Sequence, residues 1–236
     1  MRVSWPLLVM VAAAAFSWGI YVGYTGAWPW EMVQTAVRDI TGDVDARFDV
    51  DALRVGEPDK ALSSKMDVVM LGDSLVALAR WNEIFPETRI ANRGVSGDTV
   101  SGASARLDTV FAVRPKLVVV MVGINDVLVN NDRANAIAAY DQMIGKLKAS
   151  MPVVVQAIPL CSARGCQRAR ISAFNAAVRE IAMRRGATFI DINQKIAPAG
   201  TIESKFTTDG IHLSAAGYAA WRDEIAPFVT TANSAK

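Results

Sequence analysis

The chain has one histidine and two cysteines among its 236 residues, which leaves few nitrogen and sulfur ligands for a metal ion. A zinc site would have to rely on carboxylates, so we expect no metal. The chain also lacks the motifs Gly-x-Gly-x-x-Gly and Gly-x-x-x-x-Gly-Lys, which bind dinucleotides and nucleoside triphosphates. We therefore expect no cofactor of either kind.

An excess of charge of one sign is also absent, because 25 Lys and Arg face 23 Asp and Glu. Arginines are frequent between positions 164 and 185, but their helical spacing spreads them around a solvated surface. No aromatic residues are interleaved with them as they are in nucleic-acid-binding segments, so we expect no nucleic-acid partner. A site for an anionic glycan or lipid headgroup near Arg164 is an alternative to a plain charged helix face.

The single histidine, His212, lies near the carboxyl end in the segment Thr-Asp-Gly-Ile-His-Leu. It is the only imidazole available as a general base near neutral pH, and Asp209, three residues earlier, could orient its ring. A lone histidine is more often a surface or core residue. This pair therefore indicates catalysis only if a nucleophile accompanies it.

A candidate nucleophile follows a short apolar run, residues 68–71, whose β-branched residues predict a buried strand. Gly72-Asp73-Ser74 comes directly after the run and precedes a helix-compatible stretch, residues 75–81. We expect Ser74 at a strand-to-helix turn, among free backbone N–H groups. The alternative is that Asp73 or Ser74 only caps the helix. The Gly-x-Ser-x-Gly elbow of the α/β-hydrolases is absent.

Predicted strands and helices alternate along the rest of the chain. Further strands are predicted near residue 90 and at residues 117–122, 153–157 and 187–191, and helices near residues 99–113, 133–149, 167–185 and 214–229. This alternation predicts an α/β fold with a parallel sheet, helices on both faces, and a site beyond the carboxyl ends of the strands. Ser96-Gly97-Asp98 and Gly123-Ile124-Asn125-Asp126 each follow a predicted strand, so both can converge with Ser74 there.

Together, these segments resemble the four sequence blocks of the SGNH, or GDSL-type, hydrolases. Gly72-Asp73-Ser74, Gly97, Asn125 and Asp209-x-x-His212 occur in the family's order. Residues 80–86 and 92–99 also look like the compact esterase branch of the family. The resemblance implies a three-layer α/β/α, flavodoxin-like fold with a parallel five-stranded sheet.

The resemblance also implies a role for each residue. Ser74 would be the nucleophile that attacks an ester carbonyl, His212 the general base and acid, and Asp209 the group that fixes the imidazole tautomer. The backbone N–H groups of Ser74 and Gly97 and the side-chain amide of Asn125 would form the oxyanion hole.

Two further aspartates are interpreted as supporting residues. Asp73 would hold its turn through hydrogen bonds from backbone N–H groups, and Asp126 would cap the helix that follows it. No pattern in the sequence identifies residues that bind the substrate.

The first 24 residues differ in composition from the rest. Arg2 is followed by a predominantly apolar run over residues 3–24, which at about 20 residues per span is long enough to cross a bilayer. We favour a transmembrane signal anchor over a cleaved signal peptide, whose apolar core is usually shorter, although residues 12–15 are small enough for cleavage. Arg2 would mark the cytoplasmic side, and Trp28 and Trp30 the far interface. Either form places the domain in the periplasm or outside the cell.

A linker is expected over residues 25–65 and a hydrolase domain over residues 66–236. Asp and Glu outnumber Lys and Arg in the linker, which we interpret as a tether.

Cys161 and Cys166 flank a short loop after the fourth predicted strand. In an exported protein we expect them to form a disulfide at the rim of the site, the alternative being two buried thiols.

We therefore expect an envelope-localised serine esterase that works through an acyl-enzyme. Its substrates would be short-acyl esters, such as acetyl esters, of small molecules or of cell-envelope or extracellular carbohydrates. One alternative is a lysophospholipase or thioesterase, which would need a longer apolar groove, and another is an acyltransferase to a sugar hydroxyl. A noncatalytic glycan-binding module is an alternative of another class, but it would not need a nucleophile, a base and oxyanion donors.

Overall fold

The structure, a computed structural model, describes residues 65–128 and 133–234. The predicted membrane segment, residues 1–24, and almost all of the predicted linker, residues 25–65, lie outside this part of the chain. Within the described residues, no helix is both long and apolar enough to cross a membrane.

Five parallel strands form one sheet in the order β2-β1-β3-β4-β5. They are β1 (Val68–Gly72), β2 (Ile90–Gly94), β3 (Leu117–Met121), β4 (Val153–Gln156) and β5 (Thr188–Ile190). All residues of β1 and β3 are buried, because parallel sheets are covered on both faces and their strands are apolar throughout. The five strands predicted from the sequence are confirmed.

The register of the three strands on the β2 side brings their carboxyl ends to one level. Gly72, the last residue of β1, pairs with Gly94 of β2 and with Met121 of β3. The loops that follow these strands therefore start side by side. These loops carry Ser74, Gly97 and Asn125, so the predicted convergence at the carboxyl edge follows directly from the register.

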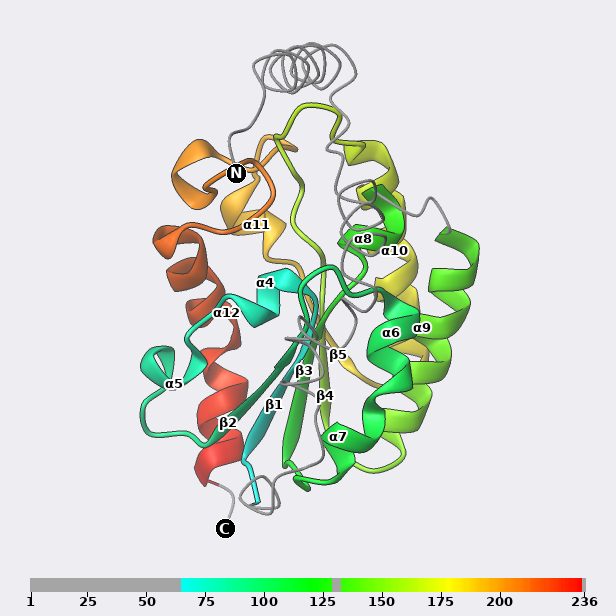
Figure 1. The fold of residues 1–236 in the computed structure, drawn as a ribbon, viewed down its shortest axis with the longest axis vertical. Helices are drawn as coiled ribbons and strands as arrows, with labels where there is room; N and C mark the ends of the chain where they lie inside the picture. Colours follow the sequence, from blue (N-terminus) through cyan, green and yellow to red (C-terminus); the bar gives the residue numbers. More distant parts are fainter. Residues whose placement is uncertain (1–64, 129–132, 235–236) are drawn as a thin grey trace, which may run out of the picture. The chain divides into compact units, whose positions relative to one another are not determined.

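Helices cover both faces of the sheet, which confirms the three-layer α/β/α architecture (Figure 1). One layer contains α6 (Val100–Ala105), α7 (Leu107–Phe111), α8 (Ile124–Leu128), α9 (Arg133–Lys148) and α10 (Arg168–Arg184). The opposite face carries α5 (Trp81–Ile84) and α12 (Ala215–Ser234). Short elements lie beyond the carboxyl ends of the strands: α4 (Ser74–Ala77), α11 (Asn193–Ile196) and the 3-10 helix η2 (Ser204–Phe206).

The last helix is fixed to the sheet by Trp221, whose side chain is fully buried. Its indole N–H donates to Gln156 Oε1 of β4 at 2.8 Å, and its ring meets Trp81 of α5 edge to face at 5.0 Å between centroids. Tyr218, one turn earlier on α12, stacks on the same indole. The start of α12 is therefore held rigidly beside α4 and α5.

Two predicted helices are shorter than expected. The helix predicted over residues 99–113 is divided at Arg106 into α6 and α7, because the Arg106 guanidinium turns inward to a carboxylate and two backbone carbonyls. The helix predicted over residues 75–81 ends after one turn. There the indole N–H of the buried Trp81 donates to Val76 O at 3.0 Å, which turns the chain back toward the core.

Candidate active site

Ser74 is placed by the end of β1 and by the turn that Asp73 holds. A Cβ at Gly72 would lie 2.0 Å from the Met121 carbonyl oxygen, so only glycine fits where β1 passes β3. Asp73 is the N-cap of α4, and its Oδ1 accepts the Leu75 N–H at 3.1 Å, as predicted. Burial raises the pKa of Asp73 to about 7, although hydrogen bonds from the Leu75 and Gly123 N–H groups oppose this shift.

A continuous chain of hydrogen bonds joins Ser74, His212 and Asp209. Ser74 Oγ lies 3.0 Å from His212 Nε2, and His212 Nδ1 lies 2.6 Å from Asp209 Oδ2. Because a carboxylate accepts hydrogen bonds, it holds the proton on Nδ1 and leaves Nε2 free to accept the serine proton. This is the geometry that a nucleophile, a general base and an orienting carboxylate require.

Asp209 is held in its ionised form by the loop around it. Its Oδ1 accepts the backbone N–H groups of His212 at 2.7 Å and of Ile211 at 2.8 Å. Burial opposes ionisation, but these bonds and the bond to the imidazole outweigh it and lower the pKa of Asp209 below its usual value. The carboxylate therefore keeps its orientation over the working range of a histidine base.

The loop that carries His212 rests on the loop that carries the two cysteines. Gly210 has φ +89°, and its carbonyl accepts the Ser162 N–H at 2.8 Å. Cys161 and Cys166 form the predicted disulfide, which closes the loop containing Ser162. The disulfide thus lies beside the loop that carries His212, at the carboxyl edge of the sheet, where it was expected.

Two of the predicted oxyanion donors, Gly97 and Asn125, are connected through Asp98. Gly97 has φ +79°, and Asn125 lies in the first turn of α8. The Asn125 side-chain amide donates one hydrogen to the carbonyl oxygen of Asp98 at 2.8 Å. An amide carries two hydrogens, so the second is available for a substrate oxyanion.

Arg106 is a site residue that sequence reasoning missed. Its guanidinium pairs with Asp98 Oδ2 at 2.6 Å and donates to the carbonyls of Arg93 at 2.7 Å and Gly72 at 3.0 Å. One largely buried cation therefore joins the ends of β1 and β2 to the loop of the candidate oxyanion donor Gly97. An arginine at helical spacing gave no signal that distinguished it from a surface residue.

Asp126 caps a helix that comes before it in the chain. Asp126 Oδ2 accepts the Val100 N–H at 3.0 Å, so it caps the start of α6. The predicted cap of the helix that follows Asp126 stays a prediction. Within residues 65–128 and 133–234, no three His, Cys, Asp or Glu side chains are grouped as a metal ion would require.

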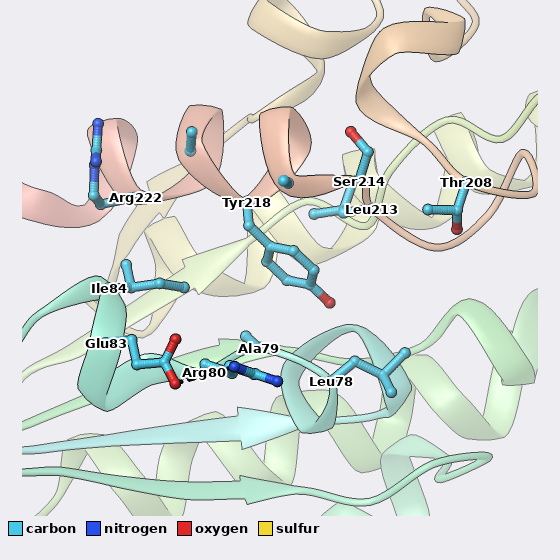
Figure 2. Close-up of a pocket in the computed structure, with 12 residues that line it drawn as sticks. Leu78, Ala79, Arg80, Glu83, Ile84, Thr208, Leu213, Ser214, Tyr218 and Arg222 are labelled. Atoms are coloured by element: carbon cyan, nitrogen blue, oxygen red, sulfur yellow. Dashed lines mark hydrogen bonds and ion pairs between the residues drawn. The ribbon is translucent and has the colours of Figure 1, made fainter.

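A cavity of about 510 Å³ lies between the α4–α5 connection and the first two turns of α12 (Figure 2). Leu78, Ile84, Leu213 and the ring of Tyr218 supply most of its apolar wall. Its polar lining comes mainly from Thr208, Ser214, Arg80, Glu83 and Arg222. Thr208, Leu213 and Ser214 belong to the segment that holds His212, so the groove runs from the candidate triad along α12.

Two of three comparisons with known proteins found matches. The model of the GDSL-like lipase/acylhydrolase family matches residues 70–220. The chain is similar to a solved Streptococcus pneumonia structure provisionally described as a platelet activating factor, with 20% identity, TM-score 0.70, and coverage of 83% of this chain and 99% of that one. No curated protein matches the chain.

Two further solved structures share the fold. A GDSL-like lipase from Bacteroides thetaiotaomicron has 21% identity and TM-score 0.63 over 79% of this chain and 97% of that one. A variant of an acetyl xylan esterase from Geobacillus stearothermophilus has 20% identity and TM-score 0.58 over 70% and 95%. Because the family model spans well over half of the sequence, the chain belongs to the GDSL-like lipase/acylhydrolase family, the SGNH hydrolases.

Proposed function

We propose that this SGNH hydrolase is a serine esterase that cleaves carboxylic esters through an acyl-enzyme. Ser74 is the nucleophile, His212 the general base and Asp209 the orienting carboxylate. The observation that carries the proposal is the hydrogen-bonded chain from Ser74 Oγ through the imidazole to Asp209, at 3.0 Å and 2.6 Å.

The reaction has two displacements. Ser74 Oγ bonds to the ester carbonyl carbon while its proton passes to His212 Nε2, and the carbonyl oxygen becomes an oxyanion. The oxyanion then reforms the carbonyl, the ester C–O bond breaks, and the imidazolium gives its proton to the leaving alcohol. Water repeats the sequence on the acyl-enzyme, which releases the carboxylic acid and restores Ser74.

Three donors receive the oxyanion in this proposal. They are the N–H of Ser74 at the first position of α4, the N–H of Gly97 and the Asn125 amide. The first N–H groups of a helix have no acceptor within the helix, so the amide of Ser74 is suited to an anion. Loss of one such donor typically lowers the rate about 10²- to 10³-fold.

For the substrate, we favour short-acyl esters, acetyl esters above all, on a carbohydrate of the cell envelope or outside the cell. The acetyl xylan esterase among the similar structures supports this substrate class, since it shares the fold over 95% of its own chain. A structural disulfide is typical of an oxidising compartment, which supports an exported domain. The apolar run over residues 3–24 supports an anchor in the membrane with the domain in the periplasm or outside the cell.

Hydrolysis of p-nitrophenyl esters of increasing acyl length tests both the mechanism and the acyl preference. The full chain is compared with Ser74→Ala and His212→Ala, and with Ser172→Ala, which removes an exposed hydroxyl on α10, as a matched control. We expect the highest kcat/KM on the acetate, a loss of at least about 10³-fold in the first two variants, and no change in the control.

Other outcomes have distinct meanings. A maximum at long acyl chains would assign the protein to the lysophospholipase or thioesterase class. Transfer of the acyl group to an added sugar in preference to water would indicate an acyltransferase. Activity that survives in Ser74→Ala would refute the mechanism, and absence of ester chemistry in a protein that binds glycan would favour a noncatalytic module.

A further inference from the structure

The groove lies on one particular side of Ser74. The oxyanion candidate Gly97 lies three residues before α6, and Asn125 is the second residue of α8. Both helices belong to the layer that covers one face of the sheet (Figure 1). His212 lies just before α12, which covers the opposite face. The groove is lined by α12, by the segment that holds His212, and by the end of α4, so it lies on the histidine side.

This placement decides which part of an ester the groove can receive. In the tetrahedral intermediate the oxyanion points to its donors, and the leaving oxygen must face His212 Nε2, because that atom gives it a proton. The alcohol part therefore extends toward the histidine side. Leu78 stands at the mouth of this path, one helical turn after Ser74, with its N–H bonded to Ser74 O at 3.0 Å.

The groove wall is apolar, rigid and open to solvent. Leu78 keeps 58% of its surface exposed, one of only two large hydrophobic side chains so exposed among the described residues. The ring of Tyr218 is fixed from two sides, because it stacks on Trp221 and its hydroxyl donates to Leu75 O at 2.9 Å. A rigid aromatic face next to apolar side chains is suited to the C–H face of a sugar ring.

The far end of the groove is charged. Figure 2 shows Glu83 and Arg222 at the end away from Thr208. Arg80 pairs with Glu83 at 3.3 Å, and both side chains are more than two thirds exposed. An exposed ion pair of this kind contributes little stability, so the same groups remain free to exchange it for hydrogen bonds with hydroxyl groups. Guanidinium groups supply donors and the carboxylate an acceptor.

We propose that this groove is the binding site for the alcohol part of the ester, and that this part is a saccharide. The proposal rests on the proposed esterase function and adds the site to it. The volume of about 510 Å³ lies within the range of about 300–1,000 Å³ that is usual for small-ligand sites. The acyl group stays outside the groove, near Ser74 and the oxyanion donors.

Two exposed alanines on α12 make a matched pair for the test. Ala219 lines the groove, whereas Ala216 lies on the same helix outside it. Ala219→Trp fills the groove, and Ala216→Trp places the same side chain elsewhere on the same helix. The readout is the ratio of kcat/KM on an acetylated xylooligosaccharide to kcat/KM on methyl acetate, two esters with one acyl group.

We expect Ala219→Trp to lower this ratio at least about tenfold relative to the unchanged protein, which corresponds to about 1.4 kcal/mol of lost transition-state binding. Ala216→Trp should keep the ratio. Equal ratios in both variants would overturn the proposal. So would a selective loss in Ala219→Trp on methyl octanoate relative to methyl acetate, since that result would assign the groove to the acyl chain. If the unchanged protein hydrolyses none of these esters, the proposed function itself fails.

Discussion

Gly210 joins the loop of His212 to the disulfide loop at a contact too close for a side chain. Its φ is +89°, and a Cβ would lie 2.4 Å from the Ala163 nitrogen and 2.8 Å from the Ala163 Cα. Gly165, within the same disulfide loop, has φ +83° and nothing within 4 Å of its would-be Cβ. Gly210→Ala and Gly165→Ala therefore share the backbone penalty and differ only in the collision.

The backbone penalty lowers the free energy of unfolding, whereas the collision lowers the rate of reaction. A non-glycine residue in the left-handed region costs about 1–2 kcal/mol, partly offset by about 0.4–1 kcal/mol from the stiffer unfolded chain. We expect Gly165→Ala to lower the free energy of unfolding by about 1 kcal/mol. In Gly210→Ala the loops must also separate by on the order of 1 Å, and a displacement of that size at reacting groups costs about 10²-fold in rate. His212, two residues further on, would be displaced from Ser74.

The measurement pairs urea unfolding with kcat and KM on p-nitrophenyl acetate for both variants. Gly210→Ala should lose about 10²-fold in kcat with little change in KM, while Gly165→Ala keeps kcat. If both variants keep kcat, the contact between Gly210 and Ala163 does not position His212. If both lose it equally, the backbone penalty and not the collision explains the effect.

Two further results are expected. Arg106→Lys keeps the positive charge opposite Asp98 but cannot bridge the carbonyls of Arg93 and Gly72. We therefore expect kcat to fall about 10- to 10²-fold, while KM and the near-ultraviolet circular dichroism stay unchanged. An unchanged kcat would show that the ion pair with Asp98 alone suffices. Burial raises the pKa of Asp73 in the folded state to about 7, above the pKa of an exposed aspartate in the unfolded chain. The folded state therefore binds the extra proton, and the free energy of unfolding falls as pH rises from about 4 to 7. In Asp73→Asn this group does not titrate, so its free energy of unfolding, measured with urea at several pH values, should rise relative to that of the unchanged protein between about pH 4 and 7. Parallel pH profiles of the two proteins would contradict the raised pKa.

The sheet could be predicted from sequence because its signals are local. Runs such as residues 68–71 and 117–122 are apolar and β-branched along their whole length, as strands buried on both faces must be. The candidate triad could also be predicted from sequence, because a single histidine leaves one choice of base and the order of the blocks indicates the candidate nucleophile. The disulfide could be predicted from the spacing of the two cysteines.

What sequence reasoning missed depends on contacts between distant segments. Arg106 breaks a predicted helix because its partners, Asp98 and the carbonyls of Arg93 and Gly72, surround it only after the strands have paired. Asp126 caps α6, which begins 26 residues earlier in the chain, so no local rule could select that target. The groove residues are equally scattered, with one wall from residues 78–84 and the other from the His212 segment and α12.

The one-turn helix α4 shows how such distant contacts determine the site. A helix of four residues is too short to be stable alone, so the position of Ser74 must come from its surroundings. A Cβ at Gly94 would lie 2.2 Å from Ala77 N, which shows how closely the end of β2 packs on this turn. The Tyr218 hydroxyl also donates to Leu75 O, one residue after Ser74. The groove wall and Ser74 are therefore parts of one rigid unit, and a ligand that packs on the Tyr218 ring would be placed at a fixed distance from Ser74.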